Sequence, residues 1–170
     1  APEFNLKDAV TLNKVSLNFI KGQKGTLIMF ICNHCPFVVH VKDEIVKIAN
    51  EYQKKGFGFV AINSNDILKY PEDSPYNMLK YAVKFKFSFP YLFDETQKIA
   101  KAYGASCTPD FFLFDKNLEL VYRGQLDDSR PANKKPVTGK DLRTALDRVI
   151  KGLAQKKEQK PSIGCNIKWK

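Results

Sequence analysis

The chain has 170 residues, of which 44% are hydrophobic and 12% aromatic, so we expect one globular domain spanning residues 1–170. It contains no apolar run of about 18 residues, the length that a membrane-spanning helix needs. The net charge is +10, but the basic residues are spread along the chain without alternating with aromatic ones. We therefore expect a Lys-rich solvated surface, and no nucleic-acid or membrane partner.

The N-terminal half predicts a short hairpin and then a strand, a long helix and a second strand. Alternating apolar residues favour the hairpin within residues 4–20, and the apolar run Thr26–Ile31 has the length of a strand buried on both faces. After Pro36, which fits the first turn of a helix, apolar residues recur at helical spacing to about residue 54. They are Val38, Val41, Ile45, Ile48, Ala49 and Tyr52. Residues 57–62 form the second apolar strand.

The C-terminal half predicts shorter elements. Helices are expected at 76–87, 95–103 and 138–153, and strands at 90–93, 111–114 and 118–123. The early strand–helix–strand unit implies parallel strands, while the late hairpin adds antiparallel ones. The sequence therefore predicts an α/β fold with a central mixed sheet flanked by helices. Residues 154–170 form a tail, whose Ile163, Ile167 and Trp169 predict docking rather than disorder.

A C-x-x-C motif, Cys32-Asn33-His34-Cys35, lies where the first buried strand ends and the long helix begins. Free N–H groups and the positive end of a helix dipole lower the pKa of a thiol placed there. We expect Cys32 to attack disulfides, because the first cysteine is usually exposed, and Cys35 to resolve the mixed disulfide. A protonated His34 would stabilise the Cys32 thiolate and make the pair more oxidising. The alternative is an exposed histidine with little effect.

Metal binding is the alternative for these two cysteines. Structural zinc sites need four ligands, commonly in two close pairs. Cys107 and Cys165 stand alone and far away in the sequence, and His40 falls inside the predicted helix. We therefore expect no metal, and no cofactor beyond the redox-active disulfide itself.

Five segments carry a resemblance to a known family. They are residues 30–38, which contain the motif, 70–75, 107–110, 122–125 and the tail 161–170. Together they resemble the redoxin branch (alkyl hydroperoxide reductase/thiol-specific antioxidant) of the thioredoxin-like superfamily, and within it the peroxiredoxin-like group with a C-x-x-C motif. The resemblance implies a thioredoxin-like fold, and either thiol–disulfide exchange or peroxide reduction.

The residues favour thiol–disulfide exchange over peroxide reduction. Peroxiredoxins carry a Pro-x-x-x-Thr-x-x-Cys motif, and alignment on Cys35 puts Cys32 at the threonine and Ile28 at the proline. The arginine that peroxiredoxins place before a later strand is replaced by Pro109. The resemblance therefore implies a thiol–disulfide oxidoreductase. A thiol peroxidase is one alternative, and a non-catalytic or metal-binding module is another.

The resemblance also assigns residues around the dithiol. Thioredoxin-like reductases have a cis-proline at the position of Pro109, which implies that Thr108-Pro109 packs beside the dithiol and that the Thr108 backbone pairs with a substrate chain. An ordinary trans proline is the alternative. The buried aspartate of thioredoxin has no counterpart within residues 27–29. Asp66 aligns with a glutamate of thioredoxin-like proteins of cytochrome c maturation, and is a candidate proton acceptor. A turn or cap residue is its alternative.

Cys107 and Cys165 are candidate auxiliary thiols. Cys107 precedes Pro109 by two residues, so the loop brings it near the dithiol, and Cys165 lies on the tail. Either thiol could resolve a mixed disulfide or store a second one. The alternative for each is a small, buried hydrophobic side chain.

The expected partners are disulfide-bearing proteins or small thiols and disulfides, with the chain acting as a monomer or weak dimer. The first residues show no signal peptide, which favours the cytoplasm. Because the chain begins without Met, a processed secreted or periplasmic form is the alternative.

Overall fold

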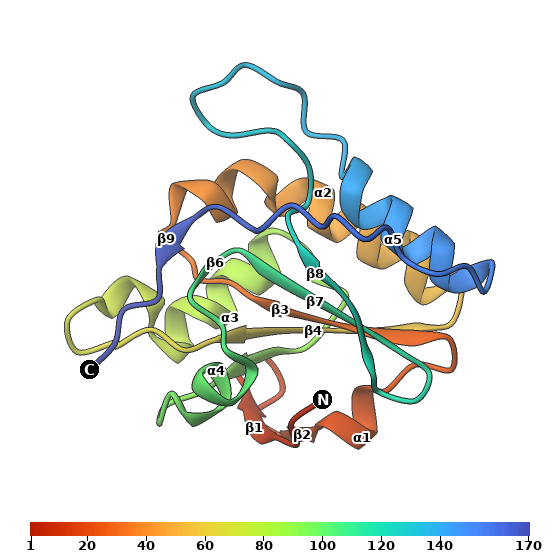
Figure 1. Cartoon of the computed structure of the whole chain (residues 1–170). Coiled ribbons are helices and arrows are strands. Elements are labelled where there is room, and N and C mark those ends of the chain that lie inside the picture. Colours follow the sequence, from red (N-terminus) through yellow and green to blue (C-terminus); the bar gives the residue numbers. More distant parts are fainter.

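The computed structural model describes all 170 residues, and a seven-stranded mixed sheet forms its centre (Figure 1). The strand order is β2-β1-β5-β4-β3-β7-β8. The strands of this sheet are β1 (Asn5–Asp8), β2 (Lys14–Ser16), β3 (Gly25–Phe30), β4 (Phe57–Asn63), β5 (Tyr91–Phe93), β7 (Asp110–Asp115) and β8 (Leu120–Gly124). A separate two-stranded sheet joins β6 (Cys107–Thr108) to β9 (Cys165–Asn166).

Five α-helices and one 3₁₀ helix accompany the sheet. They are α1 (Leu17–Ile20), α2 (Pro36–Gln53), η1 (Pro71–Asp73), α3 (Pro75–Lys84), α4 (Lys98–Tyr103) and α5 (Lys140–Ile150). The six apolar positions that predicted the long helix are the buried residues of α2. No helix combines the length and the apolar character that crossing a bilayer requires.

The central strand β3 explains where the C-x-x-C motif lies. It runs parallel to β4 and antiparallel to β7, and every one of its residues is buried. Helix α2 connects β3 to β4, so the motif lies at the sheet end where β3 passes into α2. The predicted α/β fold with a mixed sheet and an N-terminal hairpin, β1–β2, is confirmed.

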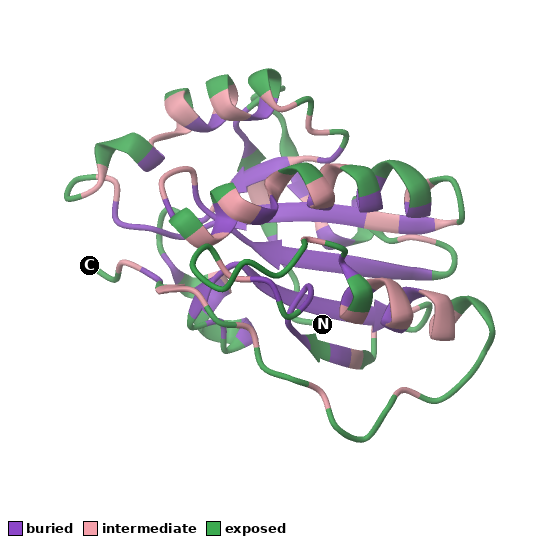
Figure 2. Cartoon of the chain, turned by 90° about the horizontal axis from the view of Figure 1, so that it is seen from above, coloured by how far each residue is buried: buried purple, intermediate pink, exposed green.

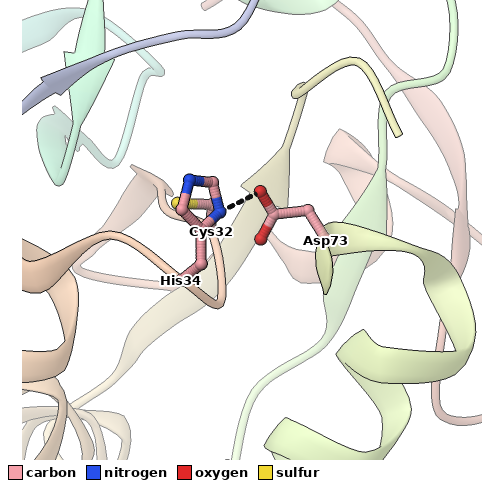
Figure 3. A group of neighbouring side chains, drawn as sticks. All are labelled: Cys32, His34 and Asp73. Carbon is pink, nitrogen blue, oxygen red and sulfur yellow. Dashed lines mark ion pairs between the residues drawn. The ribbon is translucent and has the colours of Figure 1, made fainter. Parts of the chain in front are cut away.

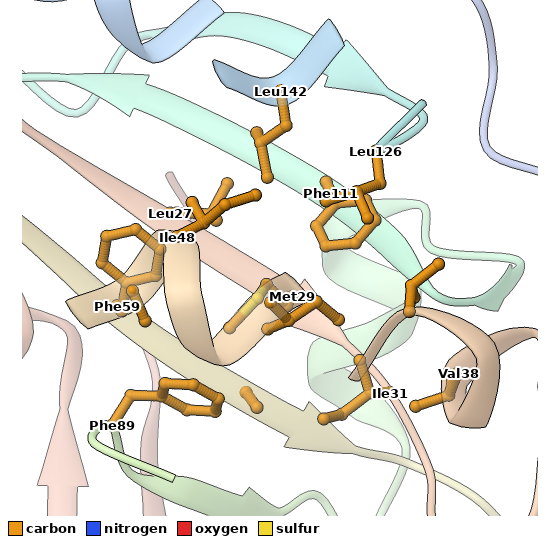
Figure 4. Close-up of a cluster of buried hydrophobic side chains, with 14 of the residues drawn as sticks. Leu27, Met29, Ile31, Val38, Ile48, Phe59, Phe89, Phe111, Leu126 and Leu142 are labelled. Carbon is orange, nitrogen blue, oxygen red and sulfur yellow. The ribbon is translucent and has the colours of Figure 1, made fainter. Parts of the chain in front are cut away.

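Alternate residues of β3 face two separate cores. Leu27 and Met29 belong to the larger core, between the sheet and helices α2, α3 and α5 (Figure 4). Ile28 and Phe30 belong to the smaller core on the opposite face, against α1 and α4. Figure 2 shows the consequence: the central strands are buried, while the helices expose their outer sides. This double burial is why β3 reads as a continuous apolar run.

Three helices are shorter than the sequence predicts, and α5 spans Lys140–Ile150 rather than residues 138–153, after Gly139 with a φ of 69°. Helix α4 begins at Lys98 rather than residue 95, because Gln97 has a φ of 63°. Helix α3 ends at Lys84 rather than residue 87, and Lys86 has a φ of 56°. Left-handed residues cannot continue a right-handed helix. The four-residue helix α1 was not expected, because one turn is too short to show periodicity.

The C-terminal tail docks on the domain beside the motif. Strand β9 pairs antiparallel with β6, and the Ile167 amide donates to the Ser106 carbonyl at 3.0 Å. Further along, the Lys168 carbonyl accepts from the Asp66 amide at 2.8 Å. The side chain of Ile167 is only 3% exposed and lies in the smaller core, whereas Ile163 is 55% exposed.

Replacing Ile167 tests whether the tail contributes to stability. We expect Ile167→Ala to lower the free energy of unfolding by roughly 2–5 kcal/mol, because it removes buried methyl groups and leaves a cavity. Ile163→Ala makes the same chemical change at an exposed position and should cost at most about 0.5 kcal/mol. Urea unfolding followed by circular dichroism measures both. Equal, small losses would show that the tail is not anchored at Ile167.

Candidate active site

The C-x-x-C motif forms the junction between β3 and α2. Cys32 lies two residues after the last residue of the strand, and Cys35 is the N-cap of the helix. The amides of Val38 and Val39 both donate to the Cys35 carbonyl at 3.0 Å, while Pro36 occupies the first turn. The local sequence thus starts the helix at the second cysteine and keeps both thiols at its N-terminal end.

Both cysteines are buried, with Cys32 1% and Cys35 0% exposed. The expectation that the first cysteine is exposed is therefore wrong for this state of the molecule. The structure shows why: the sulfurs face the loop that precedes β7. Cys32 Sγ lies 3.6 Å from Thr108 Oγ1, and Cys35 Sγ lies 3.3 Å from the Thr108 carbonyl oxygen. The Thr108–Pro109 peptide bond is cis.

The environment separates the pKa values of the two thiols. A hydrogen bond from Cys32 lowers the pKa of Cys35 to about 4 in spite of burial, and hydrogen bonds from Cys165 and Thr108 add to this effect. The same bond to Cys35, together with burial and the negative charge of Asp73, raises the pKa of Cys32. The Thr108 carbonyl favours a protonated Cys35 and opposes the shift. The surroundings of the pair therefore lower the pKa of Cys35 and raise that of Cys32, the reverse of the order that the sequence predicts.

A buried carboxylate, that of Asp73, lies against the motif. Helix η1 places it there, fully buried. Its Oδ1 accepts from the Asn33 amide at 2.8 Å, and its Oδ2 accepts from Asn65 Nδ2 at 2.9 Å. Asn63 Nδ2 donates to the Asp73 carbonyl at 2.8 Å. These bonds hold the carboxylate in place and tie the motif to the segment after β4.

His34 joins this carboxylate to the first cysteine. Its Nδ1 lies 2.5 Å from Asp73 Oδ2, an ion pair when the imidazole is protonated (Figure 3). Its ring stacks on Tyr70, with centroids 5.6 Å apart and planes at 6°. Side-chain atoms of Cys32, His34 and Asp73 all lie within 4.8 Å of one another. Such an arrangement can accept a proton from Cys32 and stabilise the resulting imidazolium.

Sequence reasoning missed Asp73 and named Asp66 instead. Asp66 Oδ1 accepts from the Leu68 amide at 3.0 Å, and Lys69 Nζ lies 3.9 Å from Oδ2. Asp66 therefore serves as a turn residue, which was the alternative interpretation. The carboxylate that contacts the motif belongs to Asp73. Asp73 did lie within a segment that resembles the family, residues 70–75, but 38 residues separate it from Cys35 and no spacing rule connects them.

The two candidate auxiliary cysteines, Cys107 and Cys165, have different surroundings. The Cys107 thiol donates to the carbonyls of Pro109 at 3.8 Å and Ser162 at 3.9 Å. Burial and the nearby Asp110 raise its pKa to about 11. Cys165, in contrast, hydrogen-bonds through its thiol to Cys35, and burial together with this bond raises its pKa to about 11.

The group Cys32, His34 and Asp73 is also the arrangement closest to a metal site. All three residue types are zinc ligands, but a structural zinc site uses four ligands. Both carboxylate oxygens of Asp73 already accept hydrogen bonds, from Asn33 and Asn65. The residues therefore fit a redox dithiol better than a zinc site.

A mixed sheet that presents a C-x-x-C dithiol at a helix N-terminus, against a cis-proline loop, defines a thioredoxin-like protein. Comparison with known proteins agrees. The model of the Redoxin family matches residues 1–142. The chain therefore belongs to the Redoxin family, which confirms the predicted redoxin branch. The narrower peroxiredoxin-like group stays a prediction.

Three known proteins illustrate the similarity. The structure of an uncharacterized conserved protein from Geobacillus kaustophilus is 59% identical, with a TM-score of 0.98, and the match covers all of this chain and 90% of that one. A putative thioredoxin from Neisseria meningitidis is 24% identical, with a TM-score of 0.68 and 89% of both chains covered, and shows the thioredoxin-like fold. A thiol-disulfide oxidoreductase ResA from Geobacillus thermodenitrificans is 30% identical over 69% of this chain. The match spans 62% of that relative's length.

The ultraviolet absorbance of thiolates tests where the charge resides. In the reduced wild-type protein, we expect one thiolate at neutral pH, whose absorbance disappears as the pH falls through about 4. Cys35→Ser should abolish this step, because burial and Asp73 keep Cys32 protonated. Cys32→Ser should retain it, since a serine hydroxyl can still donate to Cys35. The reverse pattern would place the thiolate on Cys32.

Proposed function

We propose that this protein is a thiol–disulfide oxidoreductase that cycles Cys32 and Cys35 between a dithiol and a disulfide. The observation that carries this proposal is the position of both thiols at the N-terminal end of α2, with their sulfurs 3.6 Å and 3.3 Å from Thr108 in the cis-Pro109 loop. A relative named thiol-disulfide oxidoreductase ResA supports it, although the chain spans less than two thirds of that protein.

Cys32 is the attacking residue in this proposal. The sulfur of Cys35 is enclosed by Cys32, Thr108 and Cys165, whereas Cys32 adjoins His34, whose side chain is 26% exposed. His34 takes the proton of Cys32, and Asp73 stabilises the imidazolium. The Cys32 thiolate forms a bond to one substrate sulfur, and the other substrate sulfur leaves as a thiolate.

Cys35 completes the exchange. Its thiolate attacks Cys32 Sγ, so the Cys32–Cys35 disulfide forms and the second substrate sulfur leaves. The substrate disulfide gains two electrons, which the dithiol loses. Run in the opposite direction, the same steps oxidise a dithiol substrate.

We infer that the partners are disulfide-bearing proteins or small thiols and disulfides. We also propose that the protein acts as a monomer or weak dimer and needs no cofactor. In a reducing compartment such as the cytoplasm, the pair would be kept reduced and act as a reductant. In an oxidising compartment the same pair would donate its disulfide. Stoichiometric zinc in the purified protein would contradict the cofactor-free mechanism.

Trapping of mixed disulfides tests the oxidoreductase function. A Cys35→Ser variant lacks the resolving thiol. It should therefore accumulate covalent complexes with a disulfide-containing protein such as insulin, linked through Cys32. Cys32→Ser should trap at least tenfold less. Mass spectrometry of the complexes identifies the bond.

The rate of oxidation by hydrogen peroxide distinguishes the oxidoreductase from a thiol peroxidase. Stopped-flow oxidation of the wild-type thiols by hydrogen peroxide should be as slow as for an ordinary thiolate. Absence of trapped complexes, together with peroxide oxidation faster by several orders of magnitude, would replace the oxidoreductase by a thiol peroxidase.

Replacing Asp73 tests whether His34 accepts the proton of Cys32 with the help of this carboxylate. We expect Asp73→Asn to slow insulin reduction at neutral pH by roughly 10²-fold, the lower range for general base catalysis, because His34 loses the partner of its positive charge. The deficit should shrink as the pH rises, since solvent then takes the proton of Cys32. Asp43→Asn makes the same substitution on α2, where the side chain is 79% exposed, and serves as the control. A faster Asp73→Asn enzyme would show that this carboxylate only suppresses the Cys32 thiolate.

A further inference from the structure

A third thiol, that of Cys165, contacts the dithiol and has no part in the mechanism above. Cys165 pairs across β6–β9 with Thr108, whose carbonyl oxygen lies 3.3 Å from Cys35 Sγ, and its side chain packs against the core cluster that contains both motif cysteines. Cys165 is 133 residues from Cys32 in the sequence, so the fold, not local spacing, brings the three sulfurs together.

The backbone of the tail sets the position of this thiol. Thr108 and Cys165 are direct partners in the antiparallel pairing of β6 with β9, which lie side by side in Figure 1. Gly164 passes so near the loop that a Cβ there would lie 1.9 Å from the Thr108 carbonyl oxygen and 3.2 Å from Pro109 N. Only glycine fits this approach, and the pairing then directs the next residue to the dithiol.

The tail also occupies the edge of β6. An extended substrate chain that pairs with Thr108 would form the same antiparallel ladder that β9 forms now. Cys165 therefore occupies the position beside Cys35 that a substrate cysteine would take. A substrate could reach this position only by displacing the tail.

We propose that Cys165 is a third redox cysteine, which forms an alternative disulfide with Cys35. This inference rests on the proposed function, because the exchange starts from the Cys32–Cys35 disulfide. The Cys165 thiolate attacks Cys35 Sγ, the Cys35–Cys165 bond forms and the Cys32–Cys35 bond breaks. Cys32 leaves as a thiolate and takes up the proton that Cys165 released. No electrons enter or leave the protein.

The exchange has two consequences for the site. It frees Cys32 for a second attack while the first disulfide is stored between Cys35 and Cys165. It also ties β9 covalently to the start of α2, which fixes the tail over Thr108. Cys107 is not a candidate for this role, because its thiol contacts the carbonyls of Pro109 and Ser162 rather than another sulfur.

Disulfide mapping of single variants tests the proposal. Each reduced protein is treated with glutathione disulfide, which takes up two electrons and leaves as two thiols, then alkylated, digested and analysed by mass spectrometry. We expect Cys32→Ser to form an intrachain Cys35–Cys165 disulfide, and wild type to contain both this bond and Cys32–Cys35. Cys35→Ser should form neither. Cys107→Ser is the matched control and should give the wild-type pattern.

A second variant separates redox chemistry from folding. Gly164→Ala should push the tail off Thr108, lower the Cys35–Cys165 fraction several-fold and speed insulin reduction, while circular dichroism confirms that it folds. The inference is overturned if Cys32→Ser yields only glutathione adducts or intermolecular bonds at Cys35, even when wild type reduces insulin. If the Cys35–Cys165 bond forms but Cys35→Ser traps no substrate, the proposed function fails and the third redox cysteine stands.

Discussion

The close approach of Thr108 to the two sulfurs is the contact on which the rest of the site depends. Its hydroxyl lies at Cys32 and its carbonyl at Cys35, while its backbone pairs with Cys165 of the tail. Thr108 can reach both sulfurs because β7, directly after cis-Pro109, is paired with β3 along its full length. The sheet register therefore places the loop, and the loop arranges the three thiols.

The fold was largely predictable because its signals are local. Strand β3 is a continuous apolar run since both of its faces are covered, and α2 shows its buried stripe at helical spacing. What escaped prediction carries no periodicity: the single turn of α1, and the two-residue strands β6 and β9. Two residues of strand have no pattern, so their pairing follows only from where the completed sheet leaves the loop and the tail.

The site was predictable in its centre but not in its surroundings. The C-x-x-C spacing identified the dithiol by itself, and the resemblance supplied Thr108-Pro109. Asp73 escaped because its approach depends on η1 and on amide donors at Asn33 and Asn65, which lie on three separate segments. Asp66 was plausible by alignment, yet a turn uses its carboxylate locally. Residues that meet through the tertiary fold leave no spacing to detect.

The location of the charge changes how the dithiol works. A lowered pKa at Cys35 favours the reduced pair, so the reduction potential becomes less negative than the value of about −270 mV for thioredoxin. The sequence predicts a change in the same direction from His34. The cause is different, since hydrogen bonds to Cys35 supply it. A stabilised thiolate is also a good leaving group. This property serves the step in which a substrate thiolate attacks Cys32 and Cys35 leaves, whereas in the exchange with Cys165 the sulfur of Cys35 is attacked and Cys32 leaves.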